Sequence, residues 1–305
     1  MLRATRFTDP TAVDAWDNWF RWRDAGCLHD RTIDATWWRV ASAIASSGNA
    51  DGRRWAERYV EAFSRWQLLP DEWLLRVGGT GAGLPCRESA CATLNAAAFV
   101  IAPHSRQARF DDERFVDIAA LAVRMLDDAT LVAHRVVPGA VALRIGLLGF
   151  GDALHLLGIA YVDPQAVELA TLIGTLMASG TLHGTLELTE ERGTLGPATS
   201  KLLSIWRDRR VPDRLIQAAE QNGVRHSGLT AIESQERLAL LANNASDALD
   251  PRSMSTPDEK SCTSMNAHSC TGMLRESTTA AQLGIRVAIQ PWIDAPIDYP
   301  MAQVG

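Results

Sequence analysis

The tryptophans of this chain lie mostly at one end, and this distribution constrains the fold more than any other feature. Eight of the ten tryptophans precede residue 74. Residues 16–23, 36–45 and 55–66 repeat the helical period of apolar side chains in this region. A tryptophan stripe can stack bases or a cofactor, but at helical spacing it is more often part of a core. We therefore predict a helical N-terminal domain over residues 1–77, with a core of its own.

A glycine-rich stretch follows this region. Residues 78–85 (GGTGAGLP) interrupt any regular element and mark a boundary between domains. A phosphate-binding loop would lie between a strand and a helix, with a lysine or a helix N-terminus at its end. No such lysine follows this loop. We therefore interpret residues 78–92 as a linker rather than a nucleotide-binding loop.

Strand-like and helix-like segments alternate over residues 93–251, which we predict to be one domain. Strand-like runs start near Thr93, Leu143 and Leu229, and helix-like segments follow them. The helix after the first run is capped by Asp111 or Asp112. Alternation of this kind favours an α/β fold with parallel strands.

The longest predicted helix begins at Asp163 and Pro164, which suit the N-cap and the first helical position. It continues toward Glu191 and stops at Gly193. Small residues weaken it as an isolated helix but allow another element to approach one face closely. These residues are Gly174, Ala178, Gly180 and Gly184. We therefore expect a packed neighbour along this helix.

Residues 252–279 are rich in Ser, Thr, Met and Asn and have no apolar period, so we predict a flexible loop there. A C-terminal packed segment follows over residues 280–305. The loop contains Cys262, His268 and Cys270, which could supply three metal ligands, but their spacing fits no structural zinc pattern. We predict no metal site and leave the role of these three residues open.

Composition excludes several classes of function. The net charge of −6 provides no overall positive field to attract nucleic acid or anionic lipid. The longest apolar stretches fall far short of the roughly 20 residues that cross a bilayer, and the N-terminus lacks the apolar region of a signal peptide. Five cysteines without a secretion signal favour reduced thiols in a cytoplasm. We expect a cytoplasmic protein that binds neither nucleic acid nor membranes.

Several segments resemble, in order, the large catalytic subunit of ribonucleotide reductase, closest to its adenosylcobalamin-dependent class. Residues 93–100 (TLNAAAFV) resemble that family's strand SINLAAFV, and residues 242–251 (ANNASDALDP) resemble its segment ADNASNGIEP. The other matching segments are residues 22–26, 30–41, 69–70, 115–134, 144–154, 157–161, 187–193, 224–230 and 285–300. The resemblance implies a helical N-terminal domain followed by a partial, half-size α/β barrel.

The same resemblance implies catalytic candidates. The family's radical cysteine and catalytic carboxylate lie in an NPCGE loop, whose nearest counterpart is residues 84–88 (LPCRE). Cys86 is then the thiyl candidate and Glu88 the base. The family's second redox cysteine aligns with Ser89, and Cys91, two residues away, is the candidate reductant.

The family's substrate turn, APTGTIS, holds a substrate phosphate with backbone amides and hydroxyls. Residues 233–239 (ESQERLA) take its place. The resemblance leaves Ser234, Asn244 and Ser246 as candidates for substrate binding. Two glutamates of this turn stand where an anion would bind, and like charges a few ångströms apart repel strongly outside bulk water. We therefore expect the turn to repel a diphosphate.

In the family, a long stretch with half of the barrel separates the helical domain from the SINL strand, whereas only residues 78–92 span that gap here. Together with the altered turn, this favours a non-catalytic scaffold or regulatory partner that needs no cofactor. The alternative is a ribonucleoside-diphosphate reductase that binds nucleotides and adenosylcobalamin and uses a thiyl radical to make deoxyribonucleotides. The open edges of a half-barrel predict a homodimer, or a complex with another protein subunit, unless the helices of residues 11–70 cover the sheet.

Overall fold

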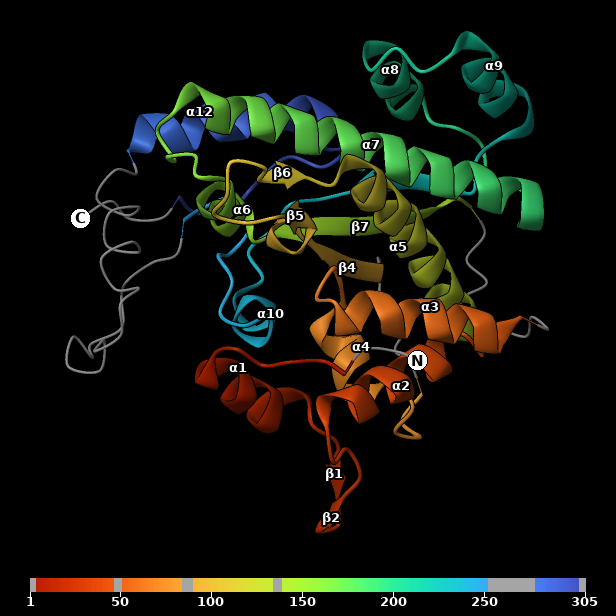
Figure 1. The fold of residues 1–305 in the computed structure, drawn as a ribbon. Helices are drawn as coiled ribbons and strands as arrows, with labels where there is room; N and C mark the ends of the chain where they lie inside the picture. Colours follow the sequence, from red (N-terminus) through yellow and green to blue (C-terminus); the bar gives the residue numbers. More distant parts are fainter. Residues whose placement is uncertain (1–3, 47–50, 84–89, 134–138, 252–277, 302–305) are drawn as a thin grey trace.

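A four-stranded sheet lies at the centre of the computed structural model, which describes residues 4–46, 51–83, 90–133, 139–251 and 278–301 (Figure 1). The strand order is β3-β4-β7-β8. The strands are β3 (Leu68–Pro70), β4 (Ala90–Asn95), β7 (Val141–Leu148) and β8 (His226–Thr230). β4, β7 and β8 are parallel, as predicted, whereas β3 is antiparallel to β4. The described residues form no closed barrel, which is consistent with a partial one.

Two long helices cover one face of this sheet. α5 (Asp112–Val132) packs against β4 and β7, and α7 (Pro164–Arg192) packs against β8. Both helices begin at predicted caps, because the carboxylates of Asp111 and Asp163 accept backbone N–H groups of the first turn. α7 ends at Gly193, as predicted.

The glycines of α7 allow α5 to approach closely. A Cβ atom at Gly180 would lie 2.6 Å from the carbonyl oxygen of Val116, and one at Gly184 would lie 2.8 Å from that of Ala120. A side chain at either position would therefore force the two helices apart. The packed neighbour that the small residues predicted is confirmed.

The N-terminal region is helical, as predicted, but its core is not separate. It contains α1 (Pro10–Ala15), a π-helical turn (Trp16–Phe20), α2 (Ile33–Ile44), α3 (Gly52–Ser64) and α4 (Glu72–Val77). The buried side chains of these helices form one continuous cluster with those of the sheet, α5 and α7. β3 makes this connection, because it follows α3 and pairs Leu69 with Thr93 of β4. The expectation of a separate core is therefore wrong.

The eight tryptophans of this region differ in burial. Trp16, Trp37 and Trp66 are buried in the shared core, whereas Trp19, Trp38 and Trp73 are each more than one-third exposed. The other two, Trp22 and Trp55, are half-buried. The interpretation of the tryptophans as core residues is confirmed only for the first group.

The remaining elements are short. They are β1 (Arg23–Asp24), β2 (Cys27–Leu28), a 3-10 turn (Ala96–Phe99), β5 (Val100–Ile101), β6 (Arg109–Phe110), α6 (Phe150–Leu157), α8 (Ser200–Asp208), α9 (Asp213–Asn222), α10 (Glu236–Leu241), α12 (Thr279–Ile289) and a second 3-10 turn (Gln290–Trp292). α8 and α9 form a helical hairpin set apart from the sheet (Figure 1). The predicted loop at residues 252–279 lies outside the described residues except for Thr278, the N-cap of α12, and Thr279, the first residue of that helix.

The last two residues of β8, at the edge of the sheet, are covered by residues near the C-terminus. Oδ2 of Asp294 accepts hydrogen bonds from the N–H groups of Leu229, at 2.7 Å, and Thr230, at 3.2 Å. The N–H of Ala295 donates to the carbonyl oxygen of Thr230 at 3.1 Å. Unpaired strand edges invite pairing with another chain, so these contacts remove the hazard here. The expectation of an open edge is therefore wrong for Leu229 and Thr230.

Candidate active site and a buried polar cluster

The two faces of the sheet differ in chemistry. Ala92, Leu94, Ile145 and Leu147 are buried apolar residues that alternate along β4 and β7 and face α5 and α7. The intervening residues point to the opposite side. Two register pairs lie there: Cys91 with Arg144, and Thr93 with Gly146. We call the side that carries these four residues the open face: Cys91 and Arg144 are half-buried there, whereas Thr93 and Gly146 are buried.

Cys91 is the predicted catalytic residue that the structure describes. It lies on the open face beside Arg144, whose guanidinium forms an ion pair with Glu233, just after β8. The two side chains of this pair are 34% and 42% exposed, so the pair contributes less than about 1 kcal/mol to stability. Cys86 and Glu88 lie outside the described residues, and their roles stay predictions.

The turn that takes the place of the family's phosphate-binding turn binds a carboxylate of the chain itself. Oγ of Ser234 donates to Oδ2 of Asp247 at 2.5 Å, and the N–H of Gln235 donates to Oδ1 of Asp247 at 2.7 Å. Gln235 is the N-cap of α10 and provides no side-chain cap of its own. Backbone N–H groups at a helix start favour a negative charge. Asp247 therefore occupies the position that the resemblance assigns to the substrate phosphate.

The surroundings of Asp247 are acidic. Burial raises the pKa of its carboxyl above the ordinary value, and the charges of Glu236 and Asp250 raise the pKa further. The hydrogen bonds from Ser234 and Gln235 oppose this shift, because they stabilise the charged form. An entering phosphate would thus meet several carboxylates around one turn.

The other two substrate-binding candidates hold segments of the chain together. Oγ of Ser246 accepts the N–H of Asp152 at 3.2 Å, and the N–H of Ser246 donates to Oδ2 of Asp152 at 2.7 Å. This reciprocal pair satisfies the first turn of α6. Nδ2 of Asn244 donates to the carboxylate of Asp9, the N-cap of α1, at 3.2 Å. The structure therefore places Ser234 at the altered turn. Asn244 contacts the start of α1, and Ser246 contacts the start of α6.

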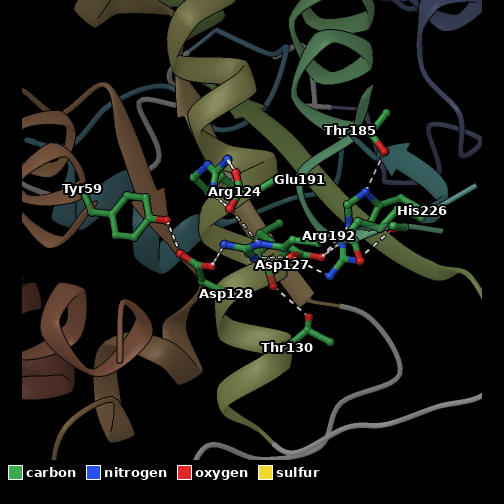
Figure 2. Close-up of polar contacts among 12 residues, drawn as sticks. Tyr59, Arg124, Asp127, Asp128, Thr130, Thr185, Glu191, Arg192 and His226 are labelled. Carbon is green, nitrogen blue, oxygen red and sulfur yellow. Dashed lines mark hydrogen bonds and ion pairs between the residues drawn. The ribbon is translucent and has the colours of Figure 1, made fainter. Parts of the chain in front are cut away.

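A second group of polar residues lies on the helix side of the sheet (Figure 2). We call it the buried polar cluster; it consists of Tyr59, Arg124, Asp127, Asp128, Thr185, Glu191, Arg192, Arg225 and His226. At its centre, Asp127 of α5 accepts hydrogen bonds from Nε of Arg225, at 2.7 Å, and Nε2 of His226, at 3.1 Å. Arg192 of α7 forms ion pairs with Asp127 and Asp128. The cluster thus connects α3, α5, α7 and β8.

The formal charges of the cluster balance when His226 is neutral, because three arginines face three carboxylates. Burial alone would raise the pKa of Asp127, but hydrogen bonds and charge interactions with His226 and Arg225 outweigh it and hold this pKa well below the ordinary value. Burial lowers the pKa of His226, and Asp127 offsets this only in part. A proton on His226 would leave the cluster with an uncompensated positive charge.

Three members of the cluster have the order of a nucleophilic triad. Oγ1 of Thr185 lies 2.8 Å from Nδ1 of His226, and Nε2 of His226 lies 3.1 Å from Oδ1 of Asp127. None of the three residues is more than 4% exposed, so no substrate can reach the hydroxyl. This arrangement is therefore structural. No sequence pattern indicated it, because His226 and Asp127 are 99 residues apart.

Metal binding and membrane insertion find no support in the described part of the chain. There, no three residues of His, Cys, Asp or Glu are placed to hold a metal ion. Cys262, His268 and Cys270 lie outside the described residues. No helix within the described ranges has the length and apolar character that crossing a membrane requires.

Comparison with known proteins identifies the family. Residues 84–266 match the sequence profile of the family described as ribonucleotide reductase, barrel domain. The chain is 26% identical over 160 residues to the ribonucleoside-diphosphate reductase subunit alpha of Chlamydia pneumoniae. This alignment covers 50% of this chain and 15% of that protein. The chain is also 30% identical over 124 residues to the subunit alpha of Chlamydia muridarum (strain MoPn / Nigg). That alignment covers 36% of this chain and 11% of that protein. The chain thus spans less than one-sixth of the length of these relatives. Because the profile covers more than half of the chain, the protein belongs to the ribonucleotide reductase barrel-domain family.

Proposed function

We propose that this protein is a non-catalytic member of the family, a cytoplasmic scaffold or regulatory partner of another protein that does not reduce ribonucleoside diphosphates. One observation carries the proposal: the carboxylate of Asp247 fills the turn at Ser234 and Gln235. The chain thereby supplies an anion of its own at the expected substrate position.

The hydrogen bonds of Asp247 indicate how strongly this contact opposes a nucleotide. A diphosphate bound in the same way would have to displace Asp247 from two hydrogen bonds. Hydrogen bonds to charged groups contribute about 1.5–3 kcal/mol each, so the displacement costs about 3–6 kcal/mol. This lowers the affinity by roughly two to four orders of magnitude. The neighbouring charge of Glu236 lowers it further.

The alternative is a catalytic protein closest to the adenosylcobalamin-dependent class, and the position of Cys91 on the open face favours it. Adenosylcobalamin supplies a radical, and such chemistry needs an enclosure that excludes water. The described residues do not fit this requirement, because Cys91 and Arg144 are only half-buried. In the catalytic alternative, the radical chemistry would therefore have to take place at Cys86 and Glu88.

Calorimetric titration with a ribonucleoside diphosphate, CDP, tests the proposal at neutral pH. The wild-type protein is expected to give no saturable heat up to millimolar nucleotide. Asp247→Ala, which vacates the turn, is expected to bind CDP more tightly than the matched control Asp298→Ala, which removes an exposed carboxylate. Saturable binding of CDP to the wild type would overturn the proposal.

A further inference from the structure

A cleft of about 220 Å³ lies between helix α8 and the β7–β8 side of the sheet. Its apolar lining includes Ala142, Leu202, Ile205, Leu229 and Pro296. Lys201, in the first turn of α8, is part of the same lining. The cleft is separate from the turn that Asp247 fills, because neither Ser234 nor Asp247 lines it.

The cleft lies where two packing units meet. The hairpin of α8 and α9 has a small hydrophobic core of its own, which includes Leu203, Trp206 and Ile216. Glycines with positive φ stand on both sides of the hairpin, Gly193 after α7 and Gly223 after α9. Binding sites for small molecules occur preferentially between such units.

An ion pair holds the two sides of the cleft together. Arg209, at the end of α8, forms a 2.7 Å ion pair with Asp294, and each side chain is 11% exposed. Nε of Arg209 also donates to the carbonyl oxygen of Pro291 at 3.0 Å. The second oxygen of Asp294 binds the edge of β8. These contacts keep α8 at a fixed distance from the sheet, so the cleft is formed before any ligand binds.

The charges that line the cleft leave one positive charge uncompensated. Arg144 is paired with Glu233, and the charge of Asp294 is paired with that of Arg209. Lys201 is one of only two lysines in the sequence, and it has no ion pair with any residue in the described ranges. Lys201 is therefore an exposed residue of the cleft lining, with no carboxylate partner in the described ranges.

We propose that this cleft binds a small amphipathic monocarboxylate, with Lys201 pairing the carboxylate and the apolar chain lying on Leu202, Ile205 and Leu229. A cleft of about 220 Å³ with a mainly apolar lining suits a short acyl chain. Its single excess positive charge suits a monoanion rather than a di- or triphosphate.

Titration with octanoate, followed by calorimetry, tests the proposal on the full chain. Octanol serves as the neutral ligand of the same length. Saturable binding of octanoate to the wild type is expected. Lys201→Gln should weaken octanoate binding roughly two- to fivefold, as for a partly exposed ion pair, and should leave octanol binding unchanged. Lys201→Arg keeps the charge and should restore most of the octanoate affinity.

Ile205→Trp provides a second variant, because its larger side chain should fill the cleft and abolish the binding of both ligands. Thermal unfolding of this variant shows whether the core of the α8–α9 hairpin is still folded. If it is not, the Lys201 variants alone test whether the cleft binds octanoate. Absence of saturable octanoate binding to the wild type, or equal octanoate affinities of the wild type and Lys201→Gln, would overturn the proposal. Either result leaves the proposed function unaffected, because that is tested with CDP at a different site.

Discussion

Replacement of Asp127 by Asn should destabilise the protein strongly. The side chain of Asp127 accepts two hydrogen bonds from Arg225, at 2.7 and 3.0 Å, and one from His226, and it forms an ion pair with Arg192. Asn keeps the shape but removes the charge, so two buried arginines lose a compensating carboxylate. Removing one partner of a buried ion pair costs about 3–5 kcal/mol. A native protein is stable by only about 5–15 kcal/mol, so this is a large fraction of the total.

Thermal unfolding followed by circular dichroism at neutral pH measures this effect. With a sensitivity of about 2 °C per kcal/mol for a chain of this size, Tm should fall by roughly 6–10 °C in Asp127→Asn. The matched control is Asp298→Asn, which changes an exposed carboxylate and should shift Tm by less than about 1 °C. Equal Tm values for the two variants would refute the conclusion that the buried polar cluster stabilises the fold.

Three further predictions concern pH, packing and assembly. Burial lowers the pKa of His226 below its unfolded value of about 6.5, so the unfolded state binds more protons below that pH. The free energy of unfolding should therefore fall by up to about 1.4 kcal/mol per pH unit from about pH 6.5 downward. Denaturant titrations at pH 7.5 and 5.5 should show that His226→Gln loses less stability between these two pH values than the wild type does. Gly180→Val should lower Tm by several degrees in the same melting assay, since its Cβ would lie 2.6 Å from the carbonyl oxygen of Val116, and an unchanged Tm would contradict the close packing of α5 and α7. Light scattering at micromolar concentration should show a homodimer, or a complex with a second protein subunit in a native extract, because Cys91 and Arg144 on the open face are only half-buried. A strict monomer without a partner would show that the chain covers the sheet alone.

Local signals allowed the two long helices to be predicted from the sequence, whereas α8 and α9 were not predicted. The starts of α5 and α7 depend on Asp111 and Asp163, whose capping groups lie within three residues of the N–H groups that they bind. The close approach of α5 was also predictable, since Gly180 and Gly184 recur at one helical spacing. β3 was not, because three residues are too few to show a strand period.

Contacts between distant residues could not be predicted in the same way. The resemblance indicated the turn at Ser234, and its acidic sequence suggested repulsion of phosphate, but only the fold brings Asp247 to the turn. The buried polar cluster joins residues that are up to 99 positions apart, so no spacing pattern could indicate it. Lys201 could be noticed as a rare residue type, but its position in a cleft depends on how α8 lies beside the sheet.

An assay of CDP reduction tests the central claim most directly. The purified chain is incubated with CDP, adenosylcobalamin and a dithiol reductant, and deoxycytidine diphosphate is measured by chromatography. Because Asp247 occupies the turn at Ser234 and Cys91 is only half-buried, we predict no product above that of a reaction without protein. Formation of deoxycytidine diphosphate by the wild type, and its loss in Cys86→Ser, would contradict the claim that the protein is non-catalytic.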